Sequence, residues 1–322
     1  MIDHHTSVPL LDTVAGELVG SDHTRLPSYP APHGADPVEW LSRSRESVDE
    51  LLSTHGAVLL RDLPVEVALF ERLVRTVGGD LLEYTERSTP RSAVHGRVYT
   101  STEYPAAEEI PMHNESSYSE RYPRLLFFLC HTAAATGGAT PIADGRAVWQ
   151  QLPEPVRERL RPGIIYTRTY RRGVGLSWQE SFQTQDRAVV ERYCREHGID
   201  VEWRHDDLHT RHRRPAFLTD PSSGAQLWFN QANLFHVTAL ADDLREALLE
   251  MYGEDGLPRN AYLADGTPIG EADLAAVRHA FDTVRYAVPW RAGDFLMVNN
   301  LLAAHGRLPF TGERRVLVAM TG

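Results

Sequence analysis

Short apolar runs separated by proline and glycine dominate the chain from about residue 94, and similar runs return near its C-terminal end. By length and pattern the early runs are strand candidates: 98–102, 112–118, 125–131 and 140–143. The late runs, 295–298 and 316–319, have the composition of buried strands. Candidate metal ligands, described below, lie in both groups. The chain must therefore come back on itself, and we expect a single domain rather than two independent ones.

The remaining segments predict how that domain is interrupted. Residues 144–290 mix strands with helical stretches near 145–160, 186–197, 240–252 and 271–283, so we expect a long helical insertion around 145–290. Residues 1–35 are rich in Pro, Ser, His and Gly and are interpreted as a flexible N-terminal arm. Asp36-Pro37 has helix-start chemistry, and Gly56 ends that helical segment. The predicted domain is 36–322.

Bulk properties exclude several function classes. The formal net charge of −11 argues against nucleic-acid binding, which normally requires a basic face. Two cysteines are too few for a disulfide framework and form no CxxC pair. The N-terminus lacks the regions of a signal peptide, and the longest apolar run, around Leu125–Cys130, is too short to cross a membrane. We expect a cytoplasmic protein without membrane contact.

His113-Asn114-Glu115 is the first candidate metal-binding group. Composition alone predicts about two His-x-acid triplets, and the chain has two, His113/Glu115 and His205/Asp207. If the first lies in a strand, its side chains at i and i+2 share one face and can bind one ion. The second lies in the charged, non-periodic stretch 204–214, which we interpret as an exposed loop.

His305 would complete a two-histidine, one-carboxylate iron(II) site. The alternative is a histidine at the edge of the core, bonded to a backbone carbonyl. The following segment favours the metal site, because Arg315 would share a strand face with Leu317 and Ala319. An arginine that points into an apolar barrel needs an anionic partner, which a bound carboxylate supplies. A register error of one residue would exchange Arg315 with Arg314.

Several ordered blocks resemble one family, the taurine dioxygenase-like Fe(II)/2-oxoglutarate oxygenases. Within it, the chain is most similar to the branch that acts on amino acids in peptide natural-product pathways, as in syringomycin biosynthesis. The similarity runs from about residue 55 to the C-terminus. The blocks are PMHNESSY (111–118), YPRLLFF (122–128), GGATPIAD (137–144), WFNQANLFH (228–236) and AHGR (304–307).

The resemblance implies a fold and a set of site residues. The fold would be mainly β, a double-stranded β-helix or jelly roll with helices packed outside. His113, Glu115 and His305 would bind Fe(II). Arg315 would bind the distal carboxylate of 2-oxoglutarate, and Thr140 would donate its hydroxyl to the same cosubstrate. Dioxygen would be the second cosubstrate, and 2-oxoglutarate would be decarboxylated to succinate.

Two departures from the family pattern bear on the reaction. The acidic ligand, Glu115, is Glu rather than the more widespread Asp; amino-acid-hydroxylating branches commonly use Glu. Related halogenases lack this carboxylate, so its presence favours hydroxylation, with desaturation, epoxidation or ring closure left open. Asn299 stands where these sequences often have Asp, which puts one contact near the site in doubt.

The substrate is less constrained by the sequence. We expect an amino acid or an amino-acid-derived molecule, free or bound to a carrier protein. Glu103 could contact it, or form a salt bridge or a strand-end cap. Asn230 and Gln231 could contact it, or satisfy buried backbone groups. The stretch 204–214 could be a cationic lid or dock an acidic carrier, or be a solvated loop.

Two other function classes stay open at this point. Two histidines and a glutamate also suit a zinc-dependent hydrolase, but that reading leaves Arg315 and Thr140 without a role. The other is a non-catalytic jelly-roll protein in which the triad is a relic. The favoured prediction is a non-haem Fe(II)/2-oxoglutarate-dependent hydroxylase of secondary metabolism.

Overall fold

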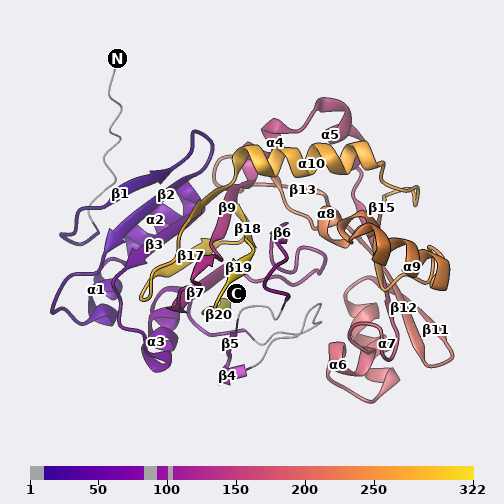
Figure 1. Cartoon of the computed structure of the whole chain (residues 1–322), viewed down its shortest axis with the longest axis horizontal. Helices are drawn as coiled ribbons and strands as arrows, with labels where there is room; N and C mark the ends of the chain where they lie inside the picture. The colour runs from indigo at the N-terminus through magenta and orange to yellow at the C-terminus, as the bar shows by residue number, and fades with distance from the viewer. Residues whose placement is uncertain (1–10, 83–92, 101–103) are drawn as a thin grey trace.

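Two facing β-sheets form the centre of the protein in the computed structural model, which describes residues 11–82, 93–100 and 104–322 (Figure 1). The larger sheet has eight strands and the smaller one four. All their neighbouring strands are antiparallel except β2 and β3. In spatial order the eight strands are β1 (Glu17–Gly20), β2 (Arg25–Pro30), β3 (Ala57–Arg61), β17 (Phe295–Asn299), β7 (Leu125–Thr132), β20 (Arg315–Thr321), β5 (Val98–Thr100) and β4 (Ala93–His95).

The smaller sheet packs against the larger one and contains the candidate site. Its strands, in spatial order, are β16 (Tyr286–Val288), β9 (Thr140–Asp144), β18 (Ala303–Arg307) and β6 (Ile110–His113). Alternate residues of the central strands meet between the sheets, where Phe128, Ile142, Val298 and Val318 belong to one buried cluster. This two-sheet core is the predicted jelly roll.

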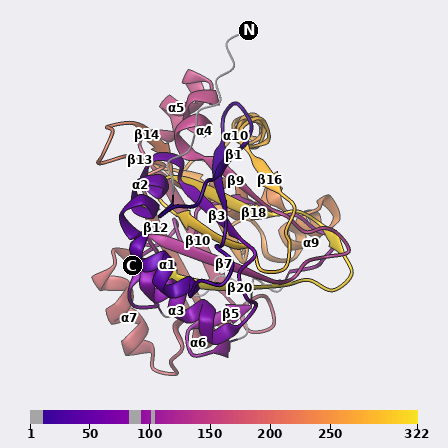
Figure 2. The same cartoon turned by 90° about the vertical axis from the view of Figure 1, so that its left-hand side faces the viewer.

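Three helices cover the outer face of the larger sheet, on the side that faces the viewer in Figure 2. They are α1 (Pro37–Arg43), α2 (Arg45–His55) and α3 (Val67–Gly78). The Asp36 side chain accepts hydrogen bonds from the first backbone N–H groups of α1, and Gly56 ends α2 in the left-handed conformation at φ 74°. The sequence placed both boundaries correctly, but the helical segment breaks in two at Ser44.

The prediction of a flexible arm over 1–35 is wrong for residues 11–35. Strands β1 and β2 extend the larger sheet, and β2 pairs in parallel with β3. Leu11 and Tyr29 are fully buried under the outer helices. Pro-rich composition indicated a loop, but the apolar surface buried in this packing outweighs the low strand propensity of the segment.

Residues between β9 and β16 form a second part of the fold, along the top and right of Figure 1. Its four-stranded sheet runs β11 (Ile199–Arg204), β12 (Asp207–Arg214), β10 (Ile164–Tyr170) and β15 (Arg259–Leu263). Its helices are α4 (Gly145–Gln151), α5 (Glu154–Leu160), α6 (Trp178–Phe182), α7 (Arg187–Glu196), α8 (Ala232–Phe235), α9 (Asp242–Tyr252), α10 (Glu271–Val284) and the 3-10 turn η1 (Val237–Ala239). Two short strand pairs complete the fold: β13 (Phe217–Thr219) with β14 (Gln226–Trp228), and β8 (Thr136–Gly137) with β19 (Phe310–Thr311). This arrangement supports the interpretation of 145–290 as an insertion.

The stretch 204–214 contains the turn and the second strand of a β-hairpin and is not an exposed loop. β11 and β12 pair in register, and His205 occupies the turn at φ 57°. Alternate residues of β12 are buried, including His212, so the charged residues between them point to solvent. The strand was not recognised from the sequence, because two of its three buried positions are Thr and His rather than aliphatic residues. Asp207 pairs with Arg171 at 2.7 Å, which gives the second His-x-acid triplet a structural role.

Among the helices of the described ranges, none combines the length and the apolar character needed to span a bilayer.

Candidate metal centre

Two histidines face each other across neighbouring strands of the smaller sheet. His113 is the last residue of β6, and it pairs directly with His305 of β18. Both are buried, and their ring centroids are 4.5 Å apart. Gly306 allows this close approach, because a Cβ there would lie 2.8 Å from the Ile110 carbonyl oxygen. The predicted return of the late strand onto the early one brings the two rings together.

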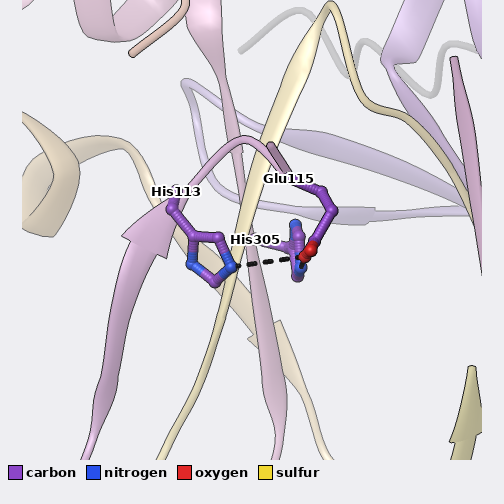
Figure 3. A group of neighbouring side chains, drawn as sticks. All are labelled: His113, Glu115 and His305. Carbon is purple, nitrogen blue, oxygen red and sulfur yellow. Dashed lines mark ion pairs between the residues drawn. The ribbon is translucent and has the colours of Figure 1, made fainter. Parts of the chain in front are cut away.

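Glu115 reaches the same point from a turn, not from a strand. β6 ends at His113, and the turn that follows includes Ser116 in the left-handed region at φ 55°. The predicted strand over 112–118 is therefore wrong beyond His113. The residue types still converge: Glu115 Oε2 lies 3.8 Å from His113 Nε2 and 4.0 Å from His305 Nε2 (Figure 3).

Asn300 holds this turn in place. Its side chain is fully buried, accepts from the Glu115 N–H at 2.7 Å, and donates to the carbonyls of Glu115 and Pro123 at 3.0 and 2.8 Å. Asn114 donates in turn to the Asn300 carbonyl at 2.8 Å. Asn300 was not recognised from the sequence, because no neighbouring residue indicates that it contacts a segment 185 residues away. The neighbouring Asn299 was singled out instead, and its side-chain oxygen accepts a hydrogen bond from the Leu301 N–H at 3.1 Å.

Asn230 and Gln231 take the second of the two roles that the sequence left open. Both are buried, and Asn230 bonds the Ala216 carbonyl and the Ala232 N–H at 2.8 and 2.9 Å. The Gln231 amide donates to the Asn114 carbonyl, directly beside the metal-site turn. These amides satisfy buried backbone groups and brace the turn. Glu103 lies outside the described residues.

The three converging side chains fit a metal ion. Their ligand atoms all lie within 4.8 Å of one another, and His113, Glu115 and His305 are the one such group of His, Cys, Asp or Glu found among the described residues. His113 Nδ1 donates to the Pro111 carbonyl at 2.8 Å, which leaves the Nε2 lone pair directed at the site. Ligands about 2.1 Å from an ion and at right angles would stand about 3 Å apart. Shortening each of the two Glu115–histidine distances by about 1 Å would therefore bring these atoms to the spacing that an ion requires.

Thr140 lies at the start of β9, in the smaller sheet. Its side chain is buried, and its Oγ1 accepts from Trp290 Nε1 at 3.1 Å. Both residues line a small cavity between the sheets with Leu59, Leu296 and Asp294. Thr140 thus faces the interior of the jelly roll, as the predicted role requires.

The arginine that enters this interior is Arg314 rather than Arg315. Val316, Val318 and Met320 face the smaller sheet, whereas Leu317 and Ala319 face the outer helices. Alternation along β20 therefore places Arg314 inside and Arg315 outside, next to a register irregularity between Arg315 and Val316. The prediction put the face shared with Leu317 and Ala319 inside the barrel, which is wrong.

The contacts of Arg314 agree with an inward position. Its Nε donates to the Gly138 carbonyl at 2.8 Å, two residues before Thr140. Burial, together with the charge of nearby Arg307, lowers the pKa of its guanidinium to about 10. Lowering by burial means that the charged form lies in a poorly solvated place where an anion would stabilise it.

Fold and site together define a jelly-roll protein with a buried two-histidine, one-carboxylate centre. The model of the "Taurine catabolism dioxygenase TauD, TfdA family" matches residues 22–321, almost the whole chain. The chain belongs to this family and is a dioxygenase, which confirms the family predicted from the sequence blocks.

Individual relatives agree with that membership. The chain is 41% identical over 280 residues to the dapdiamide synthesis protein DdaC of Enterobacter agglomerans, covering 86% of this chain and 85% of the relative. It is 30% identical over 294 residues to a clavaminate synthase-like protein of Arabidopsis thaliana, covering 87% and 86%.

Solved structures share the fold at low identity. One is PvcB of Pseudomonas aeruginosa, described as an Fe, alpha-ketoglutarate dependent oxygenase from an isonitrile synthetic pathway, with a TM-score of 0.57, 17% identity and coverage of 98% and 94%. Another is an asparagine oxygenase in complex with Fe(II), 2S,3S-3-hydroxyasparagine and succinate, with a TM-score of 0.53, 16% identity and coverage of 89% and 84%.

Proposed function

We propose that the protein is a non-haem Fe(II)/2-oxoglutarate-dependent dioxygenase that hydroxylates an amino acid or an amino-acid-derived substrate in secondary metabolism. The observation that supports it most is the convergence of His113, Glu115 and His305 within one buried cluster. Membership of a dioxygenase family and the 41% identity to a natural-product biosynthesis protein support the same reading.

Each residue of the site has a stated part in this proposal. His113, Glu115 and His305 would hold Fe(II) on one side and leave the opposite side open to ligands. Arg314 would bind the distal carboxylate of 2-oxoglutarate through a charge-assisted pair, and the hydroxyl of Thr140 would contact the same carboxylate. Arg315, the residue first predicted, would have no contact with the cosubstrate.

The bound iron and 2-oxoglutarate would supply the oxidising chemistry, with dioxygen consumed and succinate and CO₂ released. The chain's own residues orient the metal ligands and enclose the centre. Hydrogen bonds from Asn300 hold the Glu115 backbone, and the Pro111 carbonyl sets the tautomer of His113. Phe128 packs its ring 5.4 Å from that of His305 and keeps one side of the centre apolar.

The proposal extends to the setting of the reaction. The candidate substrates include a free molecule and one delivered by a carrier protein. We expect neither nucleic acid nor a membrane to take part. We place the protein in the cytoplasm; Cys130 and Cys194, both buried and unpaired with each other, are compatible with a reducing compartment.

The test measures succinate formation with Fe(II), 2-oxoglutarate, dioxygen and a panel of amino acids and peptides. Wild-type protein should form succinate faster when a substrate is present, and mass spectrometry should show a product heavier by one oxygen. A product lighter by two hydrogens would instead indicate desaturation or ring closure. His305→Ala is the inactive control, because it removes an iron ligand.

Anaerobic titration separates this function from a zinc hydrolase. Fe(II)-loaded protein should bind 2-oxoglutarate, and the zinc-loaded protein should cleave no peptide or ester bond in the same panel. If the Fe(II) protein bound no 2-oxoglutarate, the proposed function would be wrong.

A further inference from the structure

Two arginines lie side by side on the sheet of the insertion, apart from the metal centre. Arg168 of β10 and Arg259 of β15 are directly paired across the antiparallel ladder, so their side chains project from the same face. The next pair on that face, Tyr166 and Ala261, belongs to the buried cluster around the metal-site turn. The arginines therefore face the interior side of the sheet.

Like charges at directly opposed positions of a sheet repel each other. Burial is the main cause of the lowered pKa of Arg259, and the charge of Arg168 lowers it further. The residues that act on it in the opposite direction are the phenols Tyr104 and Tyr118, not carboxylates. Across the described ranges, no Asp or Glu side chain forms a hydrogen bond or ion pair with Arg259.

Arg168 and Arg259 both line a cavity of about 180 Å³. Its other walls are largely apolar and include Phe235, Leu240 and Leu257. Such a pocket, apolar with a few convergent charged groups, suits a small ligand with one charged end.

Phe235 of the cavity wall connects the cavity to the turn that holds Glu115. Tyr118, three residues further along the chain, packs its ring 5.0 Å from Phe235. The guanidinium of Arg168 lies 5.7 Å from the centre of the Tyr118 ring, and that of Arg259 lies 5.7 Å from the Phe235 ring. A ligand in this cavity would contact Phe235, whose ring packs against that of Tyr118 in the metal-site turn.

We propose that Arg168 and Arg259 form a carboxylate-binding subsite for the substrate, separate from the Arg314 side of the jelly roll. The substrate class that follows is an amino-acid-derived molecule with a free carboxylate on a short apolar or amide stem. This inference rests on the proposed function, since it assigns the substrate of the same site. A planar carboxylate matches the fork geometry of paired guanidinium groups.

The test measures binding of butyrate, as a probe with one carboxylate and an apolar stem. Anaerobic protein is first saturated with Fe(II) and 2-oxoglutarate, so that the Arg314 side is already occupied. Wild-type protein should bind butyrate saturably in calorimetry. Arg259→Met should weaken this binding about tenfold or more, because it removes a charge-assisted hydrogen bond to the carboxylate.

Arg211→Met is the matched control. Arg211 lies on β12 of the same sheet. It is exposed and lies between two buried residues of that strand. Its substitution should leave butyrate binding unchanged. Arg259→Lys keeps the charge without the fork, and its weaker effect separates loss of charge from misfolding.

Three results would overturn the inference: no saturable butyrate binding to wild type, equal binding to Arg259→Met, or saturable binding of inorganic phosphate without butyrate. In each case 2-oxoglutarate binding stays intact if the proposed function is right. A failure of the function itself would instead appear as loss of 2-oxoglutarate binding in the wild-type protein.

Discussion

Replacing Asn300 by Ala tests whether the metal-site turn depends on one buried amide. The side chain makes three hydrogen bonds to backbone groups, two of them on Glu115. Alanine leaves the Glu115 N–H and the carbonyls of Glu115 and Pro123 without these partners. The turn can then shift away from the two histidines.

The magnitude follows from burial. Each unsatisfied buried polar group costs about 1–3 kcal/mol. Three such groups predict a loss of about 3–9 kcal/mol in the free energy of unfolding, with the lower end expected where water enters the space. Loss of a group that orients a metal ligand typically weakens metal binding about 10–100-fold.

Two assays check these values. Chemical denaturation gives the free energy of unfolding, and Mn(II) titration of the folded protein gives metal affinity without turnover. Asn299→Ala is the neighbouring control; Asn299 is half-buried and its side chain caps only Leu301 N, so a change below about 1 kcal/mol is expected. If folded Asn300→Ala binds Mn(II) within twofold of wild type, the reasoning about this turn is refuted.

Three further predictions follow from the site and its surroundings. Arg314→Met should weaken anaerobic 2-oxoglutarate binding about tenfold or more, since one charge-assisted pair is lost, while Arg315→Met should leave it near the wild-type value; the opposite result would restore the sequence-based choice. Burial lowers the pKa of His212 to about 4 from its ordinary 6.5, so the unfolded chain binds the proton first as pH falls from 6.5 to 4. The free energy of unfolding should therefore drop by up to about 3 kcal/mol over this window; urea denaturation at several pH values should show a smaller drop in His212→Asn, and an equal slope in both proteins contradicts the assignment. Gly306→Ala places a Cβ 2.8 Å from the Ile110 carbonyl oxygen, and thermal denaturation should show a lower melting temperature together with weaker Mn(II) binding; an unchanged protein would mean that the two strands can separate freely.

The chemistry of the site was predictable because it is carried by residue types. Two histidines, a carboxylate and a threonine were recognised within ordered blocks, whereas the late arginine was predicted as Arg315 instead of Arg314; the family match bears out the resemblance. Helix boundaries with strong local chemistry, such as the Asp36 cap and Gly56, were also predictable. Local hydrogen bonds and backbone conformations determine these features, and a short stretch of sequence contains them in full.

Other features depend on contacts between distant segments, and only the tertiary structure decided them. β6 ends at His113 because Asn300 holds the next residues in a turn. Alternation alone cannot say which strand face is inside, so the choice between Arg314 and Arg315 needed the packing of β20 against two different layers. The pairing of Arg168 with Arg259 arises from a register between strands about ninety residues apart. The sequence determined which groups are available for chemistry, whereas long-range strand pairing and burial decided which of them meet.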